Sequence, residues 1–541
     1  MSAPSSRGRL AGWAVFFGLL AFLIHLPFTF HYGLYLGSDL AIVYLTPLRM
    51  LRGEFSIYLW GQDYMGLGPV DFITAGLFKV FGPSIPLADM VTLFAWSTGI
   101  CLVVAYVGRC FGKKVMITCG AVLAVGVPYF IKFSTQVYGT QYNMIPLAIG
   151  GYLWLAVLLV ERGGRSWLCA LTGLIMGWNW YADKLVASVW VSIGITFVLF
   201  VEGRAFLREF CRSKMAAFTL VAFLIGYSPE LLYQLGVITD RYGHVEKGSH
   251  FFSLASPQLM AQNWYMLFRC IPTYFDADPL SRSTNGVHYL NHLENWESFP
   301  LSAADTIGLI VAFIVIAYAL RSARESYQRK DFQVFMLAIC PFVNAVLVVI
   351  SPRAGGGYYG MRRYILTAGV VLVVWTGILL ARSLEAKTWR VYGVVLLMFL
   401  ISLYHQGAML QFPDELADYK KTVKDIEQHG YKYGLTWYSY AHTLTALSNE
   451  KVIFGILDRK FECPYQQTVL AQDVVVFVWP VTNPPPFESA QKLFYGSVIM
   501  KSDSTPRFLP ARLNVFGADY QQIAQPIIDG ELAWAPYQRL K

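Results

Sequence analysis

The sequence predicts a polytopic α-helical membrane protein with about eleven transmembrane helices and a small α/β domain at its C-terminus. Composition is the first reason, because 55% of the 541 residues are hydrophobic and 14% are charged, against about 25% charged in a soluble protein. Apolar runs close to the length of about 20 residues that spans a bilayer recur through residues 1–404. After residue 404 the composition changes, and short strand-like and helix-like segments alternate.

Eleven apolar runs define the predicted membrane helices. They cover residues 12–30, 86–108, 115–131, 145–160, 167–181, 185–202, 215–235, 303–320, 332–350, 364–381 and 391–404. The first run follows Arg7 and Arg9 and lacks the small-residue cleavage site of a signal peptide. We therefore expect it to be a retained helix.

The links between these runs predict the topology. One set is short and basic, as in "GRCFGKK" (108–114) and "RSARESYQRK" (321–330), and basic loops stay on the cytoplasmic side. The N-terminus is then cytoplasmic, and eleven spans place the C-terminus and the long loops 31–85 and 236–302 on the outer face. The net charge of +9 is concentrated in the short basic loops. This distribution argues against a nucleic-acid partner. The lack of an N-x-[ST] sequon favours a bacterial inner membrane.

Residues 405–541 are expected to form the α/β domain. "DELADYKKTVKDIEQHG" (414–430) has helical spacing and a C-terminal glycine. Strands are predicted at "KYGLTWY" (432–438), "KVIFGIL" (451–457) and "DVVVFVWP" (473–480), with "YSYAHTLTALSNE" (438–450) as a helix between the first two.

The eight cysteines include no C-x-x-C motif, so they predict neither a thiolate zinc site nor a redox motif. Cys270 and Cys463 both fall in segments expected on the outer face, where a disulfide can persist. A pair of separate thiols fits the sequence equally well, because spacing alone carries no geometry.

The stretch "LYLGSDLAIVYLTPLRMLRGEF" (34–55) contains Asp39, the first acid of the chain. "GSD" ahead of an apolar helix predicts an N-cap worth about 1 kcal/mol, and a functional carboxylate at the membrane edge is equally compatible with the sequence. Arg49 and Arg52 are three residues apart and so share a helical face. We expect a helix at the membrane surface with these arginines directed at headgroups or phosphate.

Other ionisable residues lie near predicted outer helix ends. Asp183 and Lys184 follow one apolar run, where either a functional role or a mutual ion pair is expected. Glu230 lies near the end of another run, with no partner evident from the sequence. Asp63 and Asp71 are loop acids, which are usually solvated. His288 and His292 have the i, i+4 spacing of metal ligands, but without H-E-x-x-H this spacing is common by chance.

Several of these stretches together resemble the GT-C membrane glycosyltransferases, in particular the branch of protein O-mannosyltransferases and aminoarabinose transferases. The resemblance rests on the acid behind the first helix and on "WGQDYMGLGPVDFITAGLFKVFG" (60–82). It extends to "GLIMGWNWYADKLVASVW" (173–190), "GYYGMRRYILTAGVVLVVW" (357–375) and "KYGLTWYSYAHTLTALSNEKVIFG" (432–455). It is spread over most of the chain.

The resemblance implies a polyprenyl-phosphate sugar as donor, a lipid, glycan or protein as acceptor, and a reaction at the outer membrane face. Asp39 matches the family's catalytic acid and would act as general base in an inverting transfer. The resemblance and the affinity of arginine for phosphate suggest that the donor phosphate is held by Arg362, Arg363, Arg353, Arg49 and Arg52. Residues expected to line the substrate cavity are Asp63, Tyr64, Tyr142, Asp183, Lys184, Glu230, His288 and His292.

Two departures from the family pattern bear on metal use. Asp39 is followed by Leu40 instead of a second acid, and the segment 132–144 contains no acid. Both departures favour arginine or lysine over a divalent Mg or Mn ion as the charge that neutralises the donor phosphate. No metal site or cofactor is therefore assigned.

Two other functions are compatible with a chain of this class. A lipid-linked oligosaccharide ligase or polymerase is expected to use Arg and His in a large outer loop instead of an early acid. A transporter or flippase of lipid-linked sugars is expected to show inverted repeats and charges near the bilayer midplane. The charges here gather at helix ends and no repeat is evident, which favours the transferase.

Overall fold

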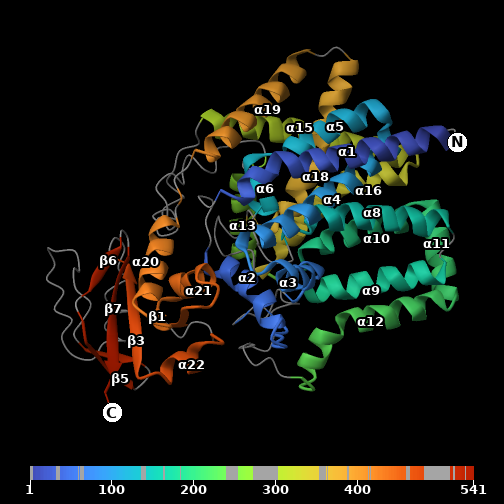
Figure 1. Cartoon of the computed structure of the whole chain (residues 1–541). Helices are drawn as coiled ribbons and strands as arrows, with labels where there is room; N and C mark the ends of the chain where they lie inside the picture. Colours follow the sequence, from blue (N-terminus) through green and yellow to red (C-terminus); the bar gives the residue numbers. More distant parts are fainter. Residues whose placement is uncertain are drawn as a thin grey trace.

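The computed structural model contains a long helical bundle joined to a mixed β-sheet (Figure 1). It describes residues 4–31, 37–58, 60, 66–135, 142–162, 165–182, 184–238, 254–271, 274, 303–352, 361, 363–386, 389–411, 414, 416–457, 463–480, 512–515, 518–524, 526–529 and 532–540.

The bundle is formed by helices that lie between Pro4 and Met409. They are α1 (Pro4–Thr29), α4 (Ile85–Phe111), α5 (Lys113–Val125), α6 (Pro128–Thr135), α8 (Ile145–Glu161), α9 (Ser166–Ala182), η2 (Lys184–Val186), α10 (Ala187–Leu199), α11 (Val201–Arg212), α12 (Met215–Gln234), α13 (Pro257–Cys270), α15 (Ala303–Gln328), α16 (Phe332–Ile350), α18 (Leu366–Glu385) and α19 (Trp389–Met409). Each predicted apolar run coincides with one to three of these helices.

Six helices in the described part of the chain are long and apolar enough to cross a membrane, or up to eight if two bent pairs each form one span. The bent pairs are α5 with α6, and η2–α10 with α11. The polytopic α-helical class is therefore confirmed. The number of eleven spans stays a prediction, because six to eight qualify among the described residues. α8 is apolar but shorter, with 17 residues.

Helix α18 lies inside the bundle and organises its core. Its residues from Leu366 to Ala381 are buried apart from Thr376. Trp375 packs edge-on to Tyr318 of α15 and donates a hydrogen bond to the Leu337 carbonyl of α16 at 3.3 Å. A helix that is apolar on every face is expected at such a position.

Two shorter helices of the first long loop, α2 (Ser38–Met50) and α3 (Pro69–Phe81), lie where the bundle meets the sheet (Figure 1). Leu40 belongs to the core of the bundle, whereas Ala41 to Leu45 and Leu48 pack into a second core built mainly from the sheet region. Consecutive residues of α2 thus connect the two hydrophobic cores.

The C-terminal region contains one mixed sheet. Its strands are β1 (Tyr433–Thr436), β2 (Ile453–Ile456), β3 (Val474–Pro480), β4 (Arg512–Val515), β5 (Ala518–Gln522), β6 (Ile527–Asp529) and β7 (Leu532–Arg539). They run in the order β2-β1-β3-β7-β5-β4, and β6 also pairs with β7. β1 is parallel to β2 and β3, and the remaining pairs are antiparallel.

Helices connect the parallel strands of this sheet, as parallel pairing requires. α21 (Tyr438–Leu447) joins β1 to β2, α22 (Gln466–Leu470) precedes β3, and α20 (Ala417–Gln428) precedes β1. The predicted helices at 414–430 and 438–450 and the three predicted strands are therefore confirmed. α19 continues to Met409, and the domain boundary between residues 404 and 405 stays a prediction.

All eight cysteines lie in the described residues, and none forms a disulfide. Cys270 is buried in the core of the bundle and Cys463 in the core that contains the sheet. Of the two alternatives left open by the sequence, the structure has the one without a Cys270–Cys463 bond.

Candidate active site between the bundle and the sheet

Asp39 lies in the first turn of α2 and does not cap it. The N-cap is Gly37, and no side chain caps the helix. The expected cap role is therefore wrong, because the helix begins at Ser38, two residues earlier than that role requires. A carboxylate in the first turn is still stabilised by the positive end of the helix dipole.

The Asp39 side chain is exposed and held by a residue of the sheet region. The Tyr438 hydroxyl, at the start of α21, donates a hydrogen bond to Asp39 Oδ1 at 2.7 Å. The two residues are 399 positions apart in the sequence. An exposed carboxylate in a fixed position can accept a proton from a bound hydroxyl group.

The rest of α2 is buried, which corrects the expected surface helix. Every residue from Leu40 to Met50 is buried, and α21 packs along α2 (Figure 1). Pro47 lies in the last turn, the helix ends at Met50, and Arg52 lies beyond it. The apolar face expected to lie against lipid packs against protein instead.

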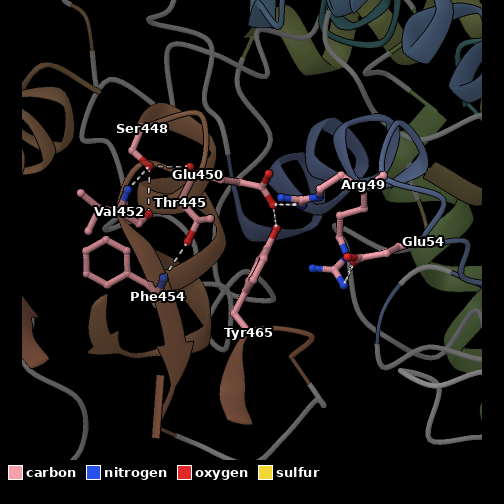
Figure 2. Close-up of polar contacts among 9 residues, drawn as sticks. Arg49, Glu54, Thr445, Ser448, Glu450, Val452, Phe454 and Tyr465 are labelled. Carbon is pink, nitrogen blue, oxygen red and sulfur yellow. Dashed lines mark hydrogen bonds and ion pairs between the residues drawn. The ribbon is translucent and has the colours of Figure 1, made fainter. Parts of the chain in front are cut away.

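Both arginines at this end of α2 pair with protein carboxylates, and Figure 2 shows Arg49 beside Glu54. Arg49 forms an ion pair with Glu54, and its guanidinium lies over the rings of Trp60 and Tyr465. Arg52 forms an ion pair with Glu450 at 2.6 Å. These contacts engage both guanidinium groups, so Arg49 and Arg52 are not part of the proposed donor-phosphate site.

Tyr142 and Arg363, two residues predicted for the site, lie together in the bundle. The Arg363 guanidinium carbon is 6.0 Å from the centre of the Tyr142 ring, a cation–π geometry. Tyr142 is buried and also contacts the ring of Phe133.

Lys184 and Glu230 also lie together, as an ion pair with Nζ 3.4 Å from Oε1. Glu230 is buried in α12, and this partner was not evident from the sequence. The alternative of an Asp183–Lys184 ion pair stays a prediction, because Asp183 lies outside the described residues.

One hydrogen bond places the Arg363 and Lys184 regions at the same end of the bundle. Thr367, one turn after Arg363, donates from Oγ1 to the carbonyl of Leu185, which follows Lys184, at 3.3 Å. The chain segments that carry Arg363 and Lys184 therefore lie near each other.

Asp71, expected to be a solvated loop acid, is buried in the first turn of α3. Burial raises the pKa of its carboxyl group to about 7, although a hydrogen bond from the Gly68 amide at 2.8 Å acts in the opposite direction. The position of Asp71 in a first helical turn could have been predicted from the sequence, since "GPVD" is typical of a helix start.

The remaining predicted site residues lie outside the described residues. They are Asp63, Tyr64, Asp183, His288, His292, Arg353 and Arg362. Within the part that is described, no three His, Cys, Asp or Glu side chains form a group that could hold a metal ion.

Sequence reasoning missed the contribution of the C-terminal region to this site. Tyr438 and His442 lie one helical turn apart on α21, with their rings 5.4 Å apart. His442 is fully buried, and burial lowers its pKa to about 3. The only available signal was the aromatic density of "TWYSYAH" (436–442), which does not indicate a partner.

The fold has counterparts among solved structures. ArnT from Cupriavidus metallidurans in the apo state aligns with a TM-score of 0.59 at 12% identity, over 97% of this chain and 98% of that chain. The same protein bound to undecaprenyl phosphate aligns with a TM-score of 0.58 over the same shares at 12% identity. An oligosaccharyltransferase from Archaeoglobus fulgidus in complex with Zn and sulfate aligns with a TM-score of 0.49 at 14% identity, over 85% and 67%.

No protein-family model and no curated protein sequence matches the chain. The likeness to ArnT covers nearly the full length of both chains, so it includes the sheet as well as the bundle. The expected resemblance to the aminoarabinose transferase branch of GT-C proteins is therefore confirmed for the fold.

Proposed function

We propose that the chain is an inverting membrane glycosyltransferase that moves a sugar from a polyprenyl-phosphate donor to an acceptor hydroxyl, with Asp39 as general base. The observation that carries the proposal is an exposed carboxylate, held by Tyr438, where the bundle meets the sheet. It is supported by a fold shared along its length with a protein whose structure contains undecaprenyl phosphate.

The proposed reaction is a single displacement. The acceptor oxygen forms a bond to the anomeric carbon as the bond from that carbon to the donor's phosphate oxygen breaks. The acceptor's proton passes to the Asp39 carboxylate, and the polyprenyl phosphate leaves with the bonding electron pair. A positioned base contributes about 10²- to 10⁴-fold to such a step.

The leaving phosphate gains negative charge and requires cationic partners. Arg363 is the described candidate. The Thr367–Leu185 hydrogen bond places its segment beside that of Lys184, whose ammonium group is paired with Glu230. Arg353 and Arg362 precede Arg363 in the chain and stay predictions as further phosphate contacts. Tyr142 would hold Arg363 through its ring face.

The reaction would take place at the outer face of a bacterial inner membrane, on the same side as the C-terminal sheet. The acceptor is defined by its chemistry as a hydroxyl group on a lipid, a glycan or a protein.

The test is sugar transfer by the purified protein in lipid nanodiscs. Radiolabelled polyprenyl-phosphate sugars are offered with lipid, glycan and peptide acceptors, and undecaprenyl phosphate binding is measured separately. We expect Asp39→Asn to lower kcat by about 10²- to 10⁴-fold and to keep lipid binding. Asp473→Asn, which changes an exposed aspartate of the sheet region, is the matched control.

Equal transfer by Asp39→Asn and the control would remove Asp39 as the base. If no labelled donor is bound or consumed, and vesicles instead show flux of a lipid-linked sugar, the chain is a transporter and the proposal is wrong.

A further inference from the structure

The two ends of α21 are both attached to α2, and this arrangement bears directly on Asp39. At its N-terminal end, the Tyr438 hydroxyl donates to Asp39 Oδ1 at 2.7 Å. Just beyond its C-terminal end, Asn449 accepts a hydrogen bond from the Tyr44 hydroxyl. The next residue, Glu450, pairs with Arg52. The helix of the sheet region therefore lies on α2 with little freedom to slide or rotate.

Side-chain hydrogen bonds hold the turn that follows α21, as Figure 2 shows. Ser448 Oγ donates to the Val452 carbonyl at 2.9 Å and accepts from the Val452 amide at 3.1 Å. Thr445 Oγ1 accepts from the Phe454 amide at 3.0 Å. These bonds close the turn onto the start of β2.

Two consecutive residues of this turn adopt a left-handed backbone although neither is glycine. Asn449 has a φ of 50° and Glu450 a φ of 62°. Such conformations are unfavourable for most residues and persist where surrounding contacts impose them. Here they direct Asn449 to Tyr44 and Glu450 to Arg52 and Tyr465.

Tyr438 itself is held from the side of the sheet. Its ring meets the fully buried ring of His442 edge-on, and His442 meets Trp60 in the same way at 5.6 Å. The preceding residue, Trp437, is the buried N-cap of α21. The hydroxyl group thus approaches Asp39 from a fixed ring.

We infer that Tyr438 is a positioning residue for the base, so that the C-terminal region completes the catalytic site. This inference rests on the proposed function of Asp39. The hydrogen bond to Oδ1 fixes the carboxylate's orientation. Among described residues no hydrogen bond engages Oδ2, and this oxygen is the one that receives the acceptor's proton.

The division between the two carboxylate oxygens has a chemical consequence. A base that is held through one oxygen presents the other at a set angle, which shortens the search for a productive geometry. The proton therefore goes to Oδ2 of Asp39, while Tyr438 keeps its own proton throughout the transfer.

The test compares Tyr438→Phe with Tyr44→Phe by transfer kinetics. Each substitution removes one hydroxyl group from an α2–sheet contact, but only the first touches Asp39. We expect Tyr438→Phe to lower kcat by about 10- to 100-fold, the range for a hydrogen bond to a charged group, with KM for the donor unchanged.

Tyr44→Phe is expected to lower the melting temperature about as much as Tyr438→Phe and to leave kcat unchanged. Combining Tyr438→Phe with Asp39→Asn should give no further loss beyond Asp39→Asn alone, because both act on one group. Additive losses in the double variant would overturn the inference.

Other outcomes also decide the matter. If Tyr438→Phe and Tyr44→Phe give the same kcat and the same KM for the donor, Tyr438 only supports the interface. If Tyr438→Phe raises kcat or lowers KM for the acceptor, its hydroxyl occupies the acceptor's place instead of orienting the base. Full activity of Asp39→Asn would remove the proposed function first, before any statement about Tyr438.

Discussion

At the scale of single residues, the ionisable side chains near the site differ in what surrounds them. Asp39 is exposed and accepts one hydrogen bond from another region of the chain, whereas Asp71, also in a first helical turn, is buried. An exposed carboxylate can exchange protons with a substrate, and a buried one mainly affects stability. The same local sequence pattern thus supports two separate roles.

Asp71 makes the protein's stability depend on pH. The folded protein holds the Asp71 proton up to about pH 7, and the unfolded chain releases it near about pH 4. Because the folded state binds more protons in this window, its stability falls as the pH rises from about 4 to about 7. Asp71→Asn keeps an acceptor oxygen for the Gly68 amide and carries no charge.

We therefore expect Asp71→Asn to raise the melting temperature above that of the wild type at pH 8, with the difference shrinking towards pH 4. The measurement is tryptophan fluorescence during thermal unfolding in detergent, from pH 4 to 8. Asp473→Asn, at an exposed position, serves as control. Melting curves of Asp71→Asn and wild type that stay parallel across this range would contradict the expectation.

The Lys184–Glu230 pair allows a second test at this scale. Lys184→Met removes a cation from beside Glu230, whose side chain is 4% exposed. The loss of folding free energy should be smaller than for fully buried pairs, where it is about 3–5 kcal/mol, since the Lys184 side chain is 25% exposed. We expect the double variant Lys184→Met/Glu230→Gln to melt at a higher temperature than Lys184→Met. A double variant that melts lower shows the two residues to be energetically independent.

At the scale of elements, close packing between α9 and α12 sets the position of Glu230. A Cβ on Gly177 of α9 would lie 2.0 Å from the Phe223 carbonyl oxygen of α12. On the other helix, a Cβ on Gly226 would lie 2.3 Å from the Leu174 carbonyl oxygen. Small residues allow membrane helices to approach this closely.

Gly177→Ala is expected to separate these helices and to destabilise the protein by about 1–3 kcal/mol, the usual cost of overpacking. Gly151→Ala on α8 is the matched control, because a Cβ there meets nothing within 4 Å. Alanine favours the helix by up to about 1 kcal/mol over glycine, so the control should be neutral or more stable. Thermal unfolding distinguishes the two, and equal melting temperatures would show that α12 shifts freely.

The sequence predicts the elements of this fold better than their surroundings. Apolar length located the bundle helices, and periodicity located α20, α21 and three strands, because these signals are local. The environment of α2 was not predictable, since its apolar face suits lipid and protein equally. Its partner, α21, begins 399 residues after Asp39. The contact between Asp39 and Tyr438 is a property of the tertiary fold.

The same distinction applies to the charges. An arginine near a helix end is compatible with a phosphate ligand, yet Arg49 and Arg52 pair with Glu54 and Glu450. Glu450 is made available by a turn whose left-handed backbone is imposed by its contacts. No local pattern in "LSNEKV" (447–452) predicts a partner on α2.

At the scale of the whole molecule, the two ends of the bundle differ in charge. The sheet, α2 and α21 lie at one end, and the N-terminus of α1 points to the other (Figure 1). At that other end Arg109 pairs with Glu161 and donates to Gln333, and Lys113 lies over Trp13. These residues come from links that are rich in Lys and Arg. By the positive-inside rule this end should face the cytoplasm.

This topology is testable with a membrane-impermeant thiol reagent. Cys211, on α11, is the exposed natural cysteine among the eight. It should be labelled in inside-out membrane vesicles and protected in intact cells. Lys432→Cys, at an exposed position beside β1 and introduced together with Cys211→Ser, should give the opposite result. Since the proposed transfer uses Asp39 on the side of the sheet, labelling of both positions from one side would contradict the topology and place the site in the wrong compartment.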